Sequence, residues 1–263
     1  MTTKLQVALL QSDLVWENPT ANRLAFQEQI ALLPATVDLV VLPEMFTTGF
    51  TMNPAANAET MEGDTVRWMQ QLAQQYQMAI VGSVVIKEVT ENDILYFNRL
   101  VFVHPDGTLD YYNKKHTFTL AGEHEVYTAG TDRLLVTYKG WKICPLICYD
   151  LRFPVWARNT VAYDLLLYVA SWPKPRIAAW DALLKARAIE NMCYTIGVNR
   201  VGVDANNHEY VGNSVCYDTL GNCVTKNDSG NAATLIVTLD REQQQSLRTK
   251  FNFLADRDGF VLV

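Results

Sequence analysis

The chain has 263 residues, of which 49% are hydrophobic and 19% are charged, a balance typical of a protein with a large buried core. Its formal net charge of −6 argues against a protein that binds nucleic acid or an anionic membrane, because both need a local basic excess. The first residues lack the apolar stretch of a signal peptide, and no segment reaches about 18 uninterrupted apolar residues, so we expect a soluble cytoplasmic protein.

In the first half of the chain, short apolar runs alternate with segments whose apolar residues recur at helical spacing. Residues 4–11 are suited to a buried strand, and residues 18–33 show a helical pattern with Pro19 in the first turn. Further strands are predicted at residues 37–42, 78–86, 95–103 and 108–112, and a further helix at residues 63–77.

The second half repeats this alternation, and no low-complexity linker separates the two halves. Strands are predicted at residues 141–147, 165–169, 193–198, 210–217 and 233–238, and helices at residues 154–162, 177–192 and 241–249. We therefore expect residues 1–263 to form one α/β domain built from layers, with central strands buried on both faces.

The cysteines indicate reduced thiols and no metal site. There are five, an odd number, and most lie in apolar, strand-like sequence: Cys144, Cys148, Cys193, Cys216 and Cys223. The pairs Cys144/Cys148 and Cys216/Cys223 lack the two-residue spacing of a zinc knuckle. We expect no metal ion and no other cofactor.

Three polar residues follow predicted strands: Glu44, Lys114 and Cys148. In open α/β sheets ligands bind at the carboxyl ends of strands, because side chains from neighbouring strands converge there. A thiol with a pKa of ~8.5 needs a base and a nearby positive charge to act as a nucleophile at neutral pH. Glu44 is the candidate base, and Lys114 together with the backbone N–H of Tyr149 would stabilise an oxyanion.

Each of these residues also has an ordinary structural interpretation. A glutamate after a strand is usually a loop residue or a helix cap, and a lysine beside Lys115 is usually a surface charge. A single cysteine is more often a small buried core residue than a nucleophile. Periodicity and spacing alone leave both interpretations open.

Three sequence motifs surround Glu44, Lys114 and Cys148: LPEMF at residues 42–46, YNKKH at residues 112–116 and LICYDLRFP at residues 146–154. These motifs resemble those of the nitrilase superfamily of carbon-nitrogen hydrolases. The resemblance covers nearly all of the chain and implies a four-layer α-β-β-α sandwich and a homodimer. It also implies that Glu44 is the general base, Lys114 the oxyanion stabiliser and Cys148 the nucleophile. A second glutamate that orients the lysine is matched to Glu123, with Glu125 as the competitor.

Within the superfamily the chain looks most like the omega-amidases, which remove the terminal amide of small 2-oxo acids such as 2-oxoglutaramate and 2-oxosuccinamate. The partners would then be a small amide and water. Such a substrate carries a carboxylate, for which Arg176 is the candidate anchor. The candidate substrate-binding residues, apart from this anchor, are Tyr149, Trp172, Phe46, Phe50 and Phe118. Arg152 and Arg187 have a structural interpretation as the alternative, in which the first pairs with a buried acid and the second with Glu190 on its own helix.

Other functions fit the same motifs. One is a related amidase that acts on a monocarboxylic amide, a carbamoyl compound or a nitrile, and another is an acyltransferase. A third is a noncatalytic protein that uses Cys148 as a sensor thiol. Glu44 and Lys114 argue against the last of these, because a sensor thiol needs neither.

Overall fold

The structure, a computed structural model, describes residues 3–225 and 230–261. Its strands are β1 (Lys4–Gln11), β2 (Leu39–Val41), β3 (Ala79–Val89), β4 (Ile94–Val103), β5 (Leu109–Asn113), β6 (Val136–Tyr138), β7 (Trp141–Ile147), β8 (Leu165–Ala170), β9 (Tyr194–Asn199), β10 (Val201–Val203), β11 (Glu209–Val211), β12 (Val215–Tyr217) and β13 (Ala233–Asp240). Its α-helices are α1 (Pro19–Ala31), α2 (Pro54–Asn57), α3 (Asp64–Tyr76), α4 (Glu123–Val126), α5 (Pro154–Ala157), α6 (Ile177–Asn191) and α7 (Arg241–Phe251). Short 3-10 helices lie at η1 (Thr119–Ala121), η2 (Cys148–Arg152), η3 (Lys174–Arg176) and η4 (Phe253–Asp256).

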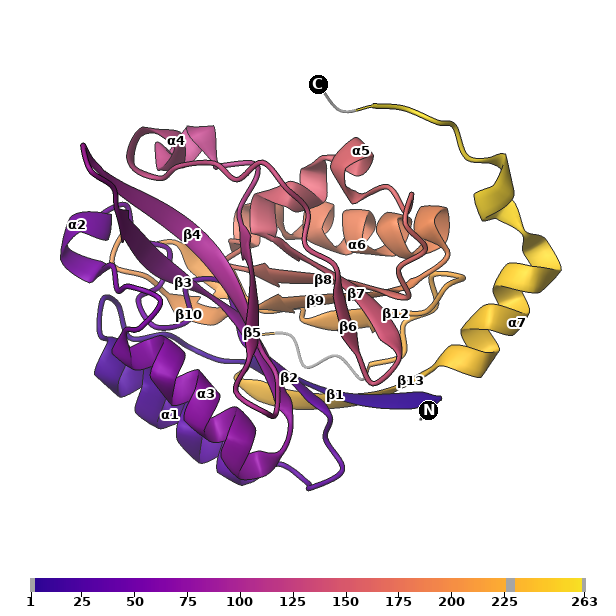
Figure 1. Cartoon of the computed structure of the whole chain (residues 1–263), viewed down its shortest axis with the longest axis horizontal. Helices are drawn as coiled ribbons and strands as arrows, with labels where there is room; N and C mark the ends of the chain where they lie inside the picture. Colours follow the sequence, from indigo (N-terminus) through magenta and orange to yellow (C-terminus); the bar gives the residue numbers. More distant parts are fainter. Residues whose placement is uncertain (1–2, 226–229, 262–263) are drawn as a thin grey trace.

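Two large sheets form the centre of the molecule (Figure 1). The first has the strand order β13-β1-β2-β3-β4-β5, and the second has the order β12-β9-β8-β7-β6. In the first sheet β2 lies parallel to both β1 and β3, and in the second sheet β8 lies parallel to both β7 and β9. The carboxyl ends of these central strands therefore point the same way within each sheet.

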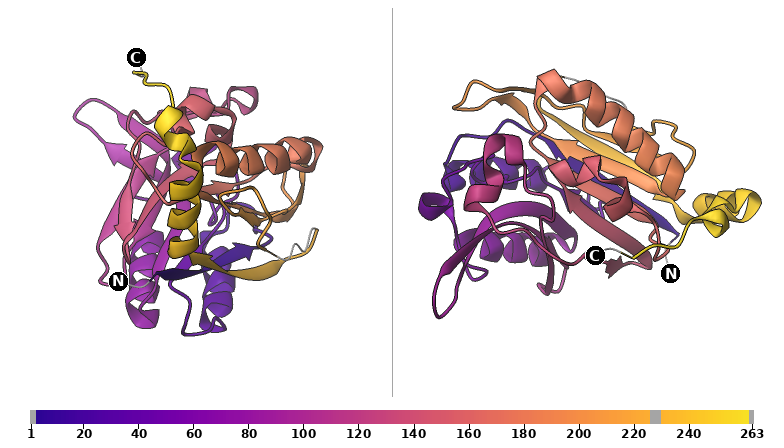
Figure 2. Two further views of the ribbon diagram at one scale, coloured as in Figure 1. Left: turned by 90° about the vertical axis from the view of Figure 1, so that its right-hand side faces the viewer. Right: turned by 90° about the horizontal axis from the view of Figure 1, so that it is seen from above.

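The sheets pack face to face, and helices cover their outer faces. One core cluster lies between the sheets and joins Leu9 of β1 to Leu146 of β7. A second cluster joins Leu10 of β1 to Phe26 of α1 and Met69 of α3. Figures 1 and 2 show α1 and α3 together on one side and α6 on the other. The four-layer α-β-β-α sandwich is thus confirmed.

The burial of β1 on both faces explains why its sequence is a nearly continuous apolar run. Successive side chains of a strand point to opposite faces of the sheet. Leu5, Val7 and Leu9 belong to the cluster between the sheets, whereas Ala8 and Leu10 belong to the cluster under the helices. Because neither face meets water along these residues, no polar residue is needed at alternate positions.

Two of the predicted elements are wrong in extent. The helix predicted at residues 154–162 is a single turn, because Arg158 leaves the helical region with ψ 131° and Ala162 takes a positive φ of 57°. The strand predicted at residues 210–217 is two strands in different sheets. Gly212 and Asn213, with φ of 70° and 56°, break it.

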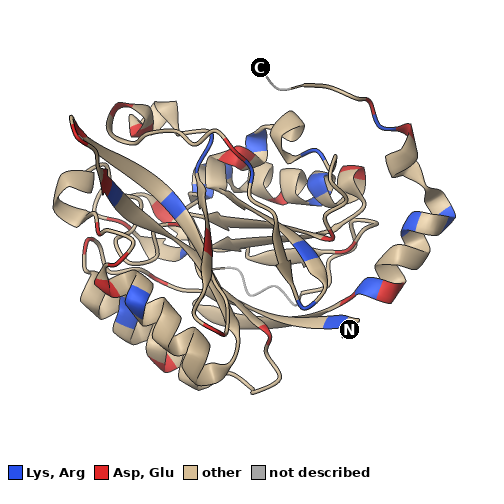
Figure 3. Ribbon diagram, in the orientation of Figure 1, with Lys and Arg blue, Asp and Glu red and all other residues tan. Residues whose placement is uncertain are grey.

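The chain ends in α7 and a C-terminal segment that lie at one end of the molecule (Figure 1). Lys and Arg are interspersed with Asp and Glu along the ribbon, and α7 carries residues of both signs (Figure 3). Within residues 3–225 and 230–261, no helix is long and apolar enough to span a membrane.

Candidate active site

Glu44, Lys114 and Cys148 meet at the ends of strands from both sheets. Glu44 follows β2 and Lys114 follows β5 in the first sheet, whereas Cys148 follows β7 in the second. Lys114 Nζ donates to Glu44 Oε1 at 2.8 Å, and both side chains are almost fully buried. The buried Cys148 thiol lies close enough to this pair for the charges of Glu44 and Lys114 to act on its pKa.

The turn after β2 aims Glu44 inward. Met45 takes a left-handed φ of 45°, and its backbone N–H donates to Ser83 Oγ on β3 at 2.8 Å. The second carboxylate oxygen of Glu44 accepts the backbone N–H of Ser171, which follows β8, at 2.8 Å. Glu44 is therefore held by groups from both sheets.

The turn after β7 is held by the buried carboxylate of Asp150. Cys148 opens this turn with a left-handed φ of 41°. Asp150 Oδ2 accepts the backbone N–H of Ile147 at 3.0 Å and the hydroxyl of Tyr112 at 2.8 Å. Asp150 Oδ1 accepts the backbone N–H of His116 at 3.0 Å, and His116 Nδ1 lies 2.7 Å away. One carboxylate thus joins the cysteine turn to the segment that carries Lys114.

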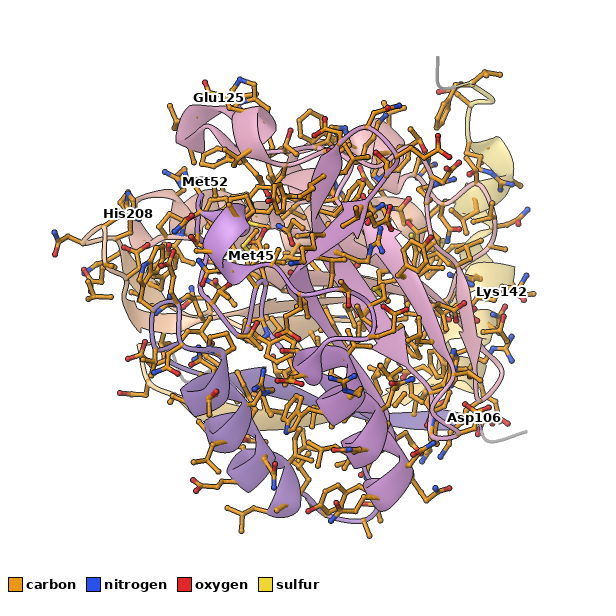
Figure 4. All side chains as sticks on the ribbon, turned by 60° about the vertical axis from the view of Figure 1, so that its left-hand side comes forward. Met45, Met52, Asp106, Glu125, Lys142 and His208 are labelled. Atoms are coloured by element: carbon orange, nitrogen blue, oxygen red, sulfur yellow. The ribbon has the colours of Figure 1, made fainter. Side chains whose placement is uncertain are left out.

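Glu123 lies beside Lys114, and Glu125 does not. Glu123 is buried at the start of α4, and its two carboxylate oxygens accept Lys114 Nζ at 3.0 and 2.8 Å. It also accepts the backbone N–H of Phe118 at 2.5 Å. Glu125 is exposed and projects from α4 at the outer edge of the molecule (Figure 4).

Burial and charge shift the pKa values of this cluster in different directions. Burial, together with the negative charge of Glu44, raises the pKa of the Cys148 thiol well above its usual value, and Lys114 opposes this only in part. Burial disfavours the charge on Lys114, but Glu123 and Glu44 outweigh it and raise the pKa of the amine. Burial also raises the pKa of Glu123, against the opposing charge of Lys114. The thiol therefore keeps its proton until a base takes it, and the lysine stays charged.

Asn98 and Ser171 complete the cluster, and the sequence analysis identified neither of them. Asn98 of β4 donates from Nδ2 to Glu44 and to Glu123. Ser171 directly follows the apolar strand β8, so the strand-end pattern that identified Cys148 could also have identified it. Asn98 lies in the middle of a strand, where no such pattern exists.

A cavity of about 500 Å³ opens above Cys148 and Lys114. The predicted substrate-binding residues that line it are Tyr149, Trp172, Arg176, Phe50 and Phe118. The prediction for Phe46 is wrong. After the left-handed turn at Met45, its ring packs in the core against Phe26 at 5.6 Å and Trp68 at 5.9 Å.

The arginines near the cavity differ in their surroundings. The guanidinium of Arg176 lies over the ring of Phe118 at 5.1 Å and is half-buried. Arg152 is exposed and lines the cavity, and its guanidinium lies 5.0 Å from the centre of the Trp172 ring. It pairs with no acid in the part of the chain that the structure describes, so the prediction of a buried acidic partner is wrong. The buried acid of that turn, Asp150, pairs with His116 instead. Arg187 contacts Glu190 at 2.8 Å as predicted.

The chain matches one protein family over most of its length. Residues 6–249 match the family model of the carbon-nitrogen hydrolases. The chain is 45% identical over 259 residues to omega-amidase YafV of Yersinia enterocolitica, a match that covers 98% of this chain and 99% of that protein. It is 31% identical over 252 residues to 2-oxoglutaramate amidase of Bacillus subtilis, a match that covers 94% of each.

A solved structure agrees with these relatives. The crystal structure of XC1258 from Xanthomonas campestris, a CN-hydrolase superfamily protein with an arsenic adduct in the active site, superposes with a TM-score of 0.95. The two chains are 41% identical, and each is covered completely. The chain therefore belongs to the carbon-nitrogen hydrolase family.

Proposed function

We propose that this protein hydrolyses the terminal amide of a small 2-oxo dicarboxylic acid monoamide, such as 2-oxoglutaramate or 2-oxosuccinamate. The products are the 2-oxo acid and ammonia. The observation that carries the proposal is the buried cluster of Glu44, Lys114 and Cys148 at the base of a cavity that also presents the guanidinium of Arg176. The relatives named omega-amidase and 2-oxoglutaramate amidase support the choice of substrate.

In the first half of the proposed reaction, Glu44 takes the proton of the Cys148 thiol while the sulfur attacks the amide carbon. The carbonyl oxygen becomes an oxyanion, which Lys114 and the backbone N–H of Tyr149 stabilise. As the oxyanion collapses, the carbon–nitrogen bond breaks, and Glu44 gives its proton to the departing ammonia. The acyl group remains on Cys148 as a thioester.

In the second half, Glu44 takes a proton from water, and the resulting hydroxide attacks the thioester. The carbon–sulfur bond breaks, the 2-oxo acid leaves, and the proton returns to the sulfur. Glu123 does not touch the substrate in this scheme. It holds Lys114 in place through both carboxylate oxygens and is a positioning residue.

The raised pKa of Cys148 is consistent with Cys148 as the nucleophile and Glu44 as its base. Because burial keeps the thiol protonated, the nucleophile forms only when Glu44 accepts the proton during the attack. A permanently ionised thiolate would instead be open to alkylation and oxidation by other molecules.

At the far end of the substrate, we propose that Arg176 binds the carboxylate. Its guanidinium lies in the cavity lining with no acidic partner in the described part of the chain. The apolar walls are Phe50, Phe118 and Trp172, with Tyr149 beside the nucleophile. A charge-assisted hydrogen bond from a half-buried guanidinium distinguishes a carboxylate-bearing amide from a neutral one.

A panel of substrates tests the function. Ammonia release is measured from 2-oxoglutaramate, glutamine, a simple aliphatic amide and an aliphatic nitrile. We expect 2-oxoglutaramate to react much faster than glutamine and Cys148→Ala to abolish the reaction while remaining folded. Equal rates on 2-oxoglutaramate and glutamine would remove the omega-amidase assignment, and a preference for the nitrile or the aliphatic amide would favour another branch of the family.

Mass spectrometry of Glu44→Gln mixed with substrate tests the role of the base. We expect either no adduct or a stalled thioester on Cys148, because the variant lacks the group that accepts and returns the proton. Normal turnover by this variant would show that Glu44 is not the base.

We also propose that the protein is a cytoplasmic homodimer in which residues 1–263 act as one domain. Phe253 and Phe260, near the C-terminal end, are exposed in the single chain, and a second subunit would cover such apolar side chains. All five cysteines are free, which supports a reducing compartment such as the cytoplasm. Light scattering after gel filtration measures the mass, and a monomer at micromolar concentration would contradict the dimer.

A further inference from the structure

The side chain of Asn98 makes the same pair of contacts as the catalytic lysine. Asn98 is almost fully buried on β4, and its Nδ2 donates to Glu44 Oε1 at 2.8 Å and to Glu123 Oε1 at 3.1 Å. Lys114 Nζ donates to these same two oxygens at 2.8 and 3.0 Å. Two nitrogen atoms, one charged and one neutral, therefore bridge one pair of carboxylate oxygens.

The orientation of the Asn98 amide follows from its neighbours. If the amide were rotated by 180°, its carbonyl oxygen would face two carboxylates, which are acceptors when ionised. In the orientation observed, the buried Oδ1 accepts no hydrogen bond from the described residues. A buried acceptor without a donor is unfavourable, so the contacts of Nδ2 determine where this side chain lies.

The charges in the cluster explain the use of a neutral donor. Two buried carboxylates share a single lysine, and each disfavours the charge on the other. A second cation in place of Asn98 would balance the charge but would also bind the carboxylate that must accept a proton. An amide supplies one N–H to each carboxylate and adds no charge.

Asn98 also sets the main chain of the lysine. Its backbone carbonyl accepts the N–H of Lys114 at 3.0 Å. The neighbouring residue on β4, Arg99, donates from Nε to Asn113 Oδ1 at 2.7 Å. The β4 strand thus holds Lys114 through its backbone and the two carboxylates through one side chain.

We propose that Asn98 is a positioning residue that holds Glu44 and Glu123 on Lys114 and stabilises the charged form of this carboxylate pair. The inference rests on the proposed function, because it assigns Glu44 as the base. The other titratable groups that interact electrostatically with the cluster are Cys148 after β7, Tyr127 after α4 and Tyr210 on β11. None of them donates to both carboxylates among the hydrogen bonds of the described residues.

The test compares Asn98→Leu and Asn98→Ala with the wild type. The first keeps the size and branching of the side chain and removes the amide donors without adding a charge, and the second removes the side chain beyond Cβ. We expect kcat on 2-oxoglutaramate to fall by about 10- to 100-fold, as for the loss of a hydrogen bond to a charged group, with KM changed by less than about threefold. The acid limb of the kcat/KM profile should move to higher pH, because the ionised pair has lost a donor.

Asn159→Ala is the matched control. Asn159 is also almost fully buried, and its Nδ2 also donates twice, to the carbonyls of Tyr163 and Asn191, which are not part of the cavity lining. We expect this variant to lose stability while its pH profile stays that of the wild type. If the Asn98 variants lose stability in the same way but keep the wild-type kcat and pH profile, Asn98 is only structural and the inference is wrong.

A second measurement needs no substrate. Iodoacetamide alkylation of Cys148 is followed by mass spectrometry of the peptide that contains it, over a range of pH. The acid limb of alkylation should also move to higher pH in both Asn98 variants. If the wild type fails to hydrolyse 2-oxoglutaramate but this shift occurs, the substrate assignment fails and the inference stands. If hydrolysis occurs and neither profile shifts, the inference alone fails.

Discussion

Replacing Asp150 by asparagine should weaken both the stability of the protein and its catalysis. The buried carboxylate accepts two backbone N–H groups, from Ile147 and His116, and the hydroxyl of Tyr112, and it contacts His116 Nδ1. Asparagine has the same shape, but its NH₂ group must face one side of this set. In one orientation the NH₂ group would face the backbone N–H of His116, and in the other it would face that of Ile147, so two donors would meet in either case.

The magnitude follows from these contacts. A hydrogen bond to a charged group contributes about 1.5–3 kcal/mol, and the substitution removes two such bonds and weakens the other two. Because the four contacts share one network, their contributions are not additive. We expect a loss of about 3–4 kcal/mol in the free energy of unfolding, which for a chain of this size corresponds to a fall in Tm of about 6–16 °C.

Differential scanning calorimetry measures the change in Tm, and ammonia release measures kcat. Since Asp150 joins the cysteine turn to the segment of Lys114, kcat should fall together with Tm, even at temperatures where the variant is folded. Asp106→Asn is the control. Asp106 is an exposed turn residue with its own hydrogen bonds to Thr108, and its substitution should change Tm by less than about 2 °C. If Asp150→Asn lowers Tm by less than about 3 °C and leaves kcat unchanged, the role given to this carboxylate is refuted.

Three further predictions concern the cavity and its surroundings. Arg176→Met should lower kcat/KM for 2-oxoglutaramate by about 10- to 100-fold and leave kcat/KM for a neutral aliphatic amide unchanged, because only the carboxylate loses a charged partner. Ammonia release measures both values, and an equal loss on the two substrates would contradict the role of Arg176 as the anchor. Gly130→Ala should cost about 2–3 kcal/mol in calorimetry, since a Cβ there would lie 2.2 Å from the carbonyl oxygen of Asn113, whereas Gly259→Ala, which meets no atom within 4 Å, should be neutral. Burial opposes the charged form of Asp204, but hydrogen bonds from His208, Tyr210 and Asn206 outweigh it and hold its pKa below the usual 3.8. The carboxylate therefore stabilises the fold above about pH 4 and loses this effect as the pH falls through the lowered pKa. Asp204→Asn should lower Tm at pH 7 by an amount that shrinks in acid, and a difference that stays constant with pH would contradict this.

The sequence predicted the elements with the strongest local signals well. The 141–147 strand has the predicted bounds, and the helices predicted at residues 18–33, 63–77 and 177–192 agree with the structure within a few residues at each end. These segments are long or uniformly apolar, so their periodicity is clear. The short elements α2, α4, β6 and β10 were not predicted, because three or four residues are too few to show a period.

The failures near the cavity have a common cause. Phe46 was expected in the cavity wall, but one residue with positive φ, Met45, turns the chain so that the ring enters the core instead. A second such turn precedes His208, which lies at the outward tip between β10 and β11 (Figure 4), because Asn207 takes a positive φ of 62°. Left-handed turns at residues other than glycine carry weak sequence signals.

By itself the sequence determined the class of fold, the three strand ends that carry Glu44, Lys114 and Cys148, and the expectation that these side chains converge. The sequence matched Glu123 to the second glutamate but left Glu125 as a competitor two residues away, and only the tertiary structure decided between them, since Glu123 is buried and accepts Lys114 Nζ whereas Glu125 is exposed. Only the structure brought in Asn98, which is 54 residues from Glu44 in sequence. Its contacts depend on the pairing of β4 with β3 and β5, and a shift of one residue in that register would turn its side chain to the other face of the sheet.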